Sequence, residues 1–135
     1  MVSQVDKAWN DYLRGRRLET GDGCPVDMAS AAYCYRRAAF RGLAEAENAL
    51  AFLYATGQGV ARDETIAVRW FEAAARQGHV SAQHNLGVMY AEGRGVPTDE
   101  QTAVRWFYQA ALGGSAEARE WLERCEAETA VAGRS

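Results

Sequence analysis

One motif occurs twice, 36 residues apart, as Gly57-Gln58-Gly59-Val60-Ala61-Arg62-Asp63 and as Gly93-Arg94-Gly95-Val96-Pro97-Thr98-Asp99. The same offset pairs Leu50 with Leu86 and Trp70 with Trp106. Between residues 46–81 and 82–117, 17 of 36 positions are identical without a gap. A fixed period of this length is the signature of a repeat architecture, in which each unit packs on its neighbours.

A weaker first copy precedes these two, with Gly21-Asp22-Gly23-Cys24-Pro25-Val26-Asp27 as its motif. It has Arg14, Cys24 and Cys34 where the second copy has Leu50, Val60 and Trp70. We therefore expect this copy to act as an N-terminal cap, since terminal repeats are atypical. A half copy follows the third. The predicted organisation is one domain over 1–129, with repeats at about 10–45, 46–81 and 82–117, a cap helix at 115–129 and a disordered tail at 130–135.

The sequence of each repeat predicts two helices joined by a loop that contains glycines. Ala46, Leu50 and Leu53 form an apolar stripe at helical spacing. Gly57 and Gly93 are placed to end helices in the left-handed conformation, and the repeated aspartates Asp27, Asp63 and Asp99 are placed to cap the next helix. The chain is thus predicted to be all-α, with helices near 5–18, 28–41, 44–56, 64–77, 80–92, 100–112 and 116–128.

Composition narrows the function classes. The net charge of -3 and the pI near 5.4 lack the overall basic excess of a nucleic-acid binder. No apolar run is long enough for a membrane span, and the N-terminus has no hydrophobic signal region, so we expect a cytoplasmic protein. A local cluster of arginines leaves two readings open, a solvated mixed-charge face or a patch for an acidic partner. It consists of Arg14, Arg16, Arg17, Arg36, Arg37 and Arg41.

No catalytic, cofactor or metal motif is found. The three cysteines are an odd number and include no C-x-x-C pair, which argues against a disulfide framework and a zinc site. His79 and His84 are five residues apart, not the four that place two ligands on one helix face, and we expect His79, at a helix start, to be a surface or a capping residue. The Gly-x-Gly pairs lie between helices, so a nucleotide-binding interpretation fails. The sequence predicts a protein that is not an enzyme.

The repeated motif Leu50-x3-Tyr54-x2-Gly57-x-Gly59-Val60-x2-Asp63-x3-Ala67-x2-Trp70-Phe71 resembles the Sel1-like repeat family. The resemblance covers nearly the whole chain, and it implies a right-handed α/α superhelix related to tetratricopeptide repeats. It also implies an adaptor that gathers other proteins, as members do in bacterial signalling, envelope assembly and host contact. A cysteine-rich branch of the family is linked with β-lactams, but this chain lacks the paired cysteines of that branch.

In such solenoids the first helix of each unit lines the concave surface. Positions there vary in type from copy to copy, whereas core positions repeat. Phe52 and Val88 are apolar where the core pattern does not require it, and could dock a peptide. The predicted partner-binding residues are Tyr12, Arg16, Asn48, Phe52, His84 and Val88.

Three alternatives remain. The apolar pair could simply extend the core. The chain could be a structural module that weakly self-associates through a repeat end at Trp9 or Trp121. A small enzyme or ligand binder would need a deep pocket with converging polar groups.

Overall fold

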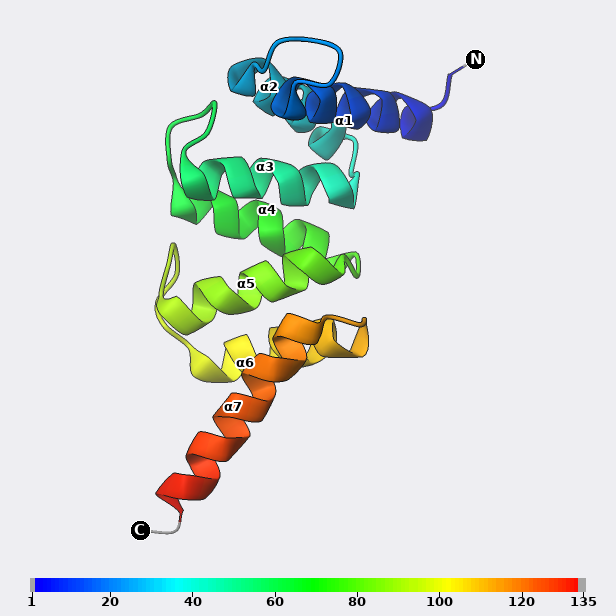
Figure 1. The fold of residues 1–135 in the computed structure, drawn as a ribbon. Coiled ribbons are helices and arrows are strands. Elements are labelled where there is room, and N and C mark those ends of the chain that lie inside the picture. The colour runs from blue at the N-terminus through cyan, green and yellow to red at the C-terminus, as the bar shows by residue number, and fades with distance from the viewer. Residues whose placement is uncertain (1, 134–135) are drawn as a thin grey trace.

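The computed structural model describes residues 2–133, and this part of the chain contains seven helices and no strand (Figure 1). The helices are α1 (Gln4–Thr20), α2 (Met28–Phe40), α3 (Ala44–Thr56), α4 (Glu64–Arg76), α5 (Val80–Glu92), α6 (Glu100–Leu112) and α7 (Ala116–Ala132). The prediction of an all-α repeat fold is therefore confirmed. No helix within residues 2–133 combines the length and apolar character needed to cross a bilayer.

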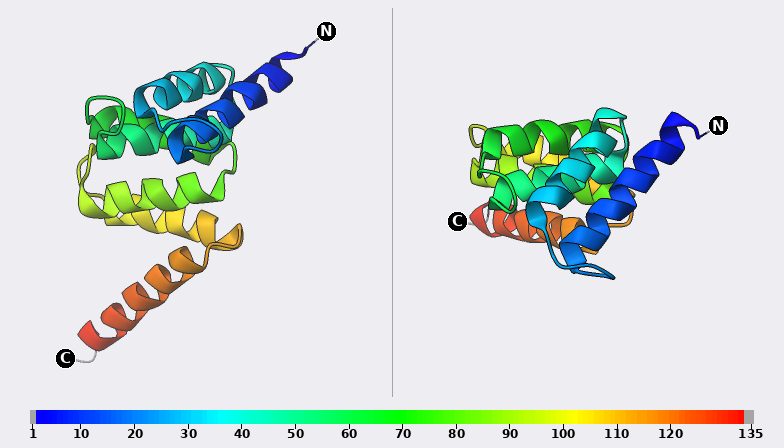
Figure 2. Two further views of the ribbon diagram at one scale, coloured as in Figure 1. Left: turned by 45° about the horizontal axis from the view of Figure 1, so that its top comes forward. Right: turned by 90° about the horizontal axis from the view of Figure 1, so that it is seen from above.

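The helices form antiparallel pairs that stack in chain order. Each unit has a first helix (α1, α3 or α5) and a second helix (α2, α4 or α6), and α7 takes the place of a fourth first helix. Figure 1 and the left view of Figure 2 place α1 near one end of the stack, and α7 runs away from the other end. The two termini therefore lie at opposite ends of the molecule.

Aspartate caps begin all three second helices. The carboxylate of Asp63 accepts a hydrogen bond from the backbone N–H of Ile66 at 3.1 Å, and Asp27 and Asp99 repeat this contact at the same distance. Such caps satisfy backbone donors that have no partner within the helix. The predicted capping aspartates are thus confirmed.

Glycines end α3 and α5 as predicted. Gly57 has φ +72° and Gly93 has φ +68°, both in the left-handed region. The N–H of Gly57 donates to the carbonyl oxygen of Leu53 at 2.8 Å, which closes the last turn. The loop then turns sharply toward the aspartate that caps the next helix.

A second glycine in each loop lets neighbouring repeats approach closely. A Cβ atom placed on Gly59 would lie 2.2 Å from the carbonyl oxygen of Met28, at the start of α2. A Cβ on Gly95 would lie 2.3 Å from the carbonyl oxygen of Glu64, at the start of α4. Only a residue without a side chain allows this contact, so these two positions fix the spacing of the stack.

The core consists of three clusters that follow one another along the stack. The first joins α1, α2 and α3, the second joins α3, α4 and α5, and the third joins α5, α6 and α7. Tyr35, Phe71 and Phe107 occupy equivalent positions on the second helices, and each is 2% exposed or less. Trp70 and Trp106 are only partly buried and pack against the cluster that joins α3, α4 and α5.

The ends of the stack differ from the expected boundaries. α1 continues to Thr20, and α7 continues to Ala132. Residues 130–132 of the expected disordered tail are therefore helical, because nothing in the sequence stops α7 before Gly133. Residues 134–135 of that tail lie outside the described residues.

Candidate functional site

The predicted site residues lie on the three first helices, at equivalent positions. Direct contact joins two of these helices, because the Asn85 side chain on α5 donates to the side-chain oxygen of Asn48 on α3 at 3.3 Å. Residues from successive repeats can therefore share one surface. We call the surface around Tyr12, Arg16, Asn48, Phe52, His84 and Val88 the first-helix face.

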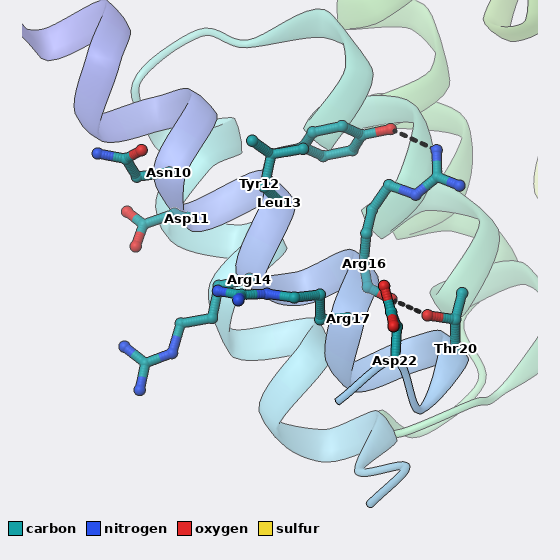
Figure 3. A pocket seen from close by; sticks show the side chains of 9 residues that line it. All are labelled: Asn10, Asp11, Tyr12, Leu13, Arg14, Arg16, Arg17, Thr20 and Asp22. Atoms are coloured by element: carbon teal, nitrogen blue, oxygen red, sulfur yellow. Dashed lines mark hydrogen bonds between the residues drawn. The ribbon is translucent and has the colours of Figure 1, made fainter. Parts of the chain in front are cut away.

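Tyr12 and Arg16 lie one helical turn apart on α1 and interact. Arg16 donates from Nη1 to the Tyr12 hydroxyl oxygen at 3.4 Å (Figure 3). This hydrogen bond is the main cause that raises the pKa of Arg16. The Tyr12 ring packs against Trp9 and Tyr35, with centroids 5.6 Å and 5.7 Å away. Tyr12 is therefore anchored, whereas the Arg16 guanidinium is exposed and available to an anionic group.

Phe52 is the clearest candidate for an anchor. Its side chain on α3 is 47% exposed, although the helix positions around it that face the core are fully covered. Leu50, Ala51 and Leu53 are each 0% exposed. Phe52 thus adds little to the core and offers a large apolar surface to solvent.

His84 and Val88 lean toward α6, the second helix of their own repeat. The His84 ring lies 5.5 Å from the Phe107 ring, and Val88 packs against the cluster that contains Phe107. Both are partly buried. At α5 the first-helix face is therefore less apolar and less exposed than at Phe52.

The adjacent row of first-helix residues turns inward. Asp11 forms ion pairs with Arg41 and with Arg37, the latter at 3.5 Å. Glu47 is 6% exposed and accepts a hydrogen bond from Gln77, which stands at the end of α4 as Arg41 stands at the end of α2. Burial raises the pKa of Glu47, and the Gln77 hydrogen bond opposes this effect.

The residues of this row therefore tie helices together instead of facing a partner. Gln83 continues the pattern by donating to the Ala75 carbonyl oxygen at 3.2 Å. The only sequence signal for this role is that the three positions are always polar although they adjoin core positions. Their partners lie 8 to 30 residues away, and spacing along one helix does not reveal them.

The structure gives His79 a capping role and leaves the three cysteines unpaired. His79 caps α5, because its Nδ1 accepts from the backbone N–H of Ala82 at 3.1 Å, one of the two roles expected for it. Burial lowers the pKa of this imidazole. Cys24, Cys34 and Cys125 are free thiols, of which Cys34 is buried. Among residues 2–133, no group of three or more His, Cys, Asp or Glu residues is arranged to hold a metal ion.

Comparison with known proteins agrees with the repeat geometry. The Sel1 repeat model matches residues 12–42, 44–79 and 80–115. No curated protein was found to match the chain. The chain resembles the solved structure of a Sel1 repeat protein from Oxalobacter formigenes, with 36% identity and a TM-score of 0.80 over 87% of this chain and 88% of that one.

Two further solved structures are similar. A protective antigen of uropathogenic Escherichia coli with an SLR fold is 37% identical, with a TM-score of 0.84 over 85% of this chain, which spans only 25% of that antigen. Helicobacter pylori cysteine-rich protein B is 20% identical, with a TM-score of 0.71 over 86% of this chain and 92% of that one, and shares the fold. With three matched repeats that cover most of its length, the chain belongs to the Sel1 repeat family.

Proposed function

We propose that this protein is a scaffold that binds a peptide or protein partner on the first-helix face, with Phe52 as the anchor. Sel1-like repeat proteins are generally protein-interaction scaffolds and typically not enzymes. The observation that carries the proposal is the 47% exposure of Phe52 on a helix whose core positions are closed. A Phe side chain that becomes buried contributes roughly 1.5–3 kcal/mol, enough for a binding hot spot.

The surroundings of Phe52 suit a peptide. Asn48 lies one turn before it on α3 and offers a hydrogen-bonding amide, and Arg16 supplies an exposed positive charge from the neighbouring repeat. An apolar anchor with polar groups around it is the usual make-up of a peptide-binding groove. The partner we propose is therefore a segment with one large apolar residue flanked by polar or acidic groups.

The test compares partner capture by the wild type and two folded variants. Phe52→Asp should lose the proteins that the wild type retains from a native lysate, while its free energy of unfolding changes by about 0.5 kcal/mol or less, as for other exposed positions. Tyr108→Asp is the matched control, because Tyr108 is 55% exposed on the second helix α6, outside the proposed surface. It should retain the same proteins as the wild type.

Two results would contradict the proposal. If Phe52→Asp stays folded and captures the same partners, the first-helix face is not where this protein binds. If Phe52→Asp melts as early as Phe71→Ala, which removes a ring that is 2% exposed, Phe52 belongs to the core. Val88 is left unchanged in this test because it packs against the third cluster.

A further inference from the structure

We propose that the protein self-associates head to tail, with the basic outer face of α1 of one copy against the acidic free face of α7 of a second copy. This contact uses the two ends of the stack, and on α1 it adjoins Tyr12 and Arg16 of the first-helix face without including Phe52. The proposal rests on two helix faces that no neighbouring helix covers among the described residues, and on the opposite charges of these faces.

The outer face of α1 stands where a preceding repeat would dock. In α3 the equivalent face is closed, because Ala46, Leu50 and Leu53 pack against α2 in one cluster. Adding 36 residues maps Asn10, Arg14 and Arg17 onto those three positions. No helix among residues 2–133 covers this face, and both arginines are exposed.

The loop after α1 also lacks the contact that internal loops make with a preceding repeat. Gly59 and Gly95 each contact the backbone of a preceding second helix, whereas a Cβ on Gly23 would meet nothing within 4 Å. The loop of α1 therefore keeps the geometry of an internal repeat, but no helix among residues 2–133 stacks on it. Leu13, which is 52% exposed, adds apolar surface at its centre.

The charge of this end is positive. Arg14 and Arg17 have no carboxylate within 4.0 Å among the described residues, and they line an open hollow together with Arg16 (Figure 3). Of the acidic groups nearby, Asp11 is paired with arginines of α2, and Glu19 accepts from the Tyr35 hydroxyl. Asp22 at the rim is the remaining negative charge of the hollow. We call Asn10, Leu13, Arg14 and Arg17 the basic end face.

At the opposite end of the stack, one side of α7 is exposed where a following second helix would pack. In the first and third repeats, one position of the first helix lies against an aromatic ring of the second helix, because a Cβ would lie 2.7 Å from the Tyr35 ring at Gly15 and 3.0 Å from the Phe107 ring at Gly87. Glu123 takes this position in α7 and is exposed, because no second helix follows α7 within the described residues. Glu126 replaces Tyr54 and Tyr90 of the earlier copies.

α7 carries net negative charge along its free side. Its glutamates are Glu117, Glu120, Glu123, Glu126 and Glu128, against the two arginines Arg119 and Arg124. We call Glu120, Glu123 and Glu126 the acidic end face. The spacing of three residues between Glu123 and Glu126 equals that between Arg14 and Arg17, so each pair occupies successive turns on one side of its helix.

The contact must be intermolecular, because the two faces lie at opposite ends of the stack (Figure 1). A contact between two different faces leaves one of each free in a dimer, so association grows into open chains. Attraction between exposed charges is screened by salt. We therefore expect association that increases with protein concentration and weakens with added salt.

A reciprocal charge reversal tests the pairing by sedimentation velocity at low salt. The variant Arg14→Glu/Arg17→Glu has two acidic ends, and the variant Glu123→Arg/Glu126→Arg has two basic ends. Each variant alone should sediment as a monomer, and an equimolar mixture should associate again, because each acidic end then meets a basic one. Circular dichroism checks that both are folded.

The control is Arg69→Glu/Arg105→Glu. It changes the net charge as Arg14→Glu/Arg17→Glu does, but at exposed positions of the second helices α4 and α6. It should associate as the wild type does. A wild type that stays monomeric at every concentration at low salt would overturn the proposal. The proposal would also be overturned if both variants are folded and their mixture stays monomeric, because self-association would then use a different surface. None of these substitutions touches Phe52, so partner capture can fail or succeed independently.

Discussion

Gly95 lies where the loop of the third repeat touches the second helix of the repeat before it. Its φ of +73° and the 2.3 Å separation between a Cβ and the Glu64 carbonyl oxygen are two separate constraints. Gly23 has nearly the same φ, +76°, but no atom near its Cβ position. The pair therefore separates the cost of backbone conformation from the cost of close packing.

We expect Gly23→Ala to lower the free energy of unfolding by about 1 kcal/mol, because alanine is strained in the left-handed region. Gly95→Ala should lower it by roughly 1–3 kcal/mol more, since the contacted atom is backbone and cannot move aside without parting the repeats. Urea unfolding monitored by circular dichroism measures both. Equal losses would show that the close approach does not hold the repeats together.

Glu47 is a buried carboxyl whose replacement should stabilise the protein. Burial raises its pKa in the folded state, so the folded protein holds this proton more tightly than the unfolded chain does. Its contribution to stability is therefore complete below the ordinary glutamate pKa, about 4.3, and is lost as the pH rises through the raised value.

Glu47→Gln keeps an oxygen that can accept from Gln77 and removes the charge. At neutral pH the variant should be more stable than the wild type, by on the order of 1 kcal/mol, and its stability should decline less above pH ~4.3. Thermal melts across this pH range measure both effects. Glu128→Gln, on an exposed position of α7 outside the acidic end face, is the control and should melt as the wild type does. A destabilised Glu47→Gln at neutral pH would contradict this account.

At the scale of helices, the sequence predicted most boundaries because each boundary has a local chemical signal. α3 and α5 match the expected 44–56 and 80–92 at both ends, where Gly57 and Gly93 stop the helix. α7 was predicted too short because Glu126 to Ala132 contains no glycine or proline, and its cap, Gly133, lies beyond the expected end. Helix termini are thus predictable where a residue actively ends the helix.

The candidate site was only partly accessible to sequence reasoning. The period alone placed Phe52 and Val88 at equivalent positions, but it could not show that Phe52 is 47% exposed while Val88 packs against the third cluster. Beside Val88, the Phe107 ring packs close to α5, where a Cβ on Gly87 would lie 3.0 Å from it. Exposure depends on the neighbouring helix, whereas the period describes only one helix at a time. The role of these residues in partner binding stays a prediction.

For the whole molecule, the three clusters mean that stability is shared between neighbours and not across the stack. Phe107 lies in the cluster of α5, α6 and α7, and its ring stacks on Trp121 with centroids 4.2 Å apart. Phe71 lies in the central cluster, which Trp70 links to the first cluster and Tyr90 links to the third. In such arrays the coupling passes only through interfaces between adjacent units.

The two aromatic rings should therefore differ in how far their loss is felt. Truncation of either ring to alanine should cost about 3–5 kcal/mol, since each is 2% exposed or less. In Phe107→Ala, we expect amide hydrogen exchange to accelerate in α6 and α7, while α1, α2 and α3 keep their protection, because an end unit can open alone. In Phe71→Ala, the central interface is lost and exchange should accelerate in helices on both sides of it.

Hydrogen exchange read by mass spectrometry, peptide by peptide, distinguishes the two patterns. Uniform acceleration in both variants would mean that the stack unfolds as one cooperative unit, and that the cluster boundaries do not limit its opening.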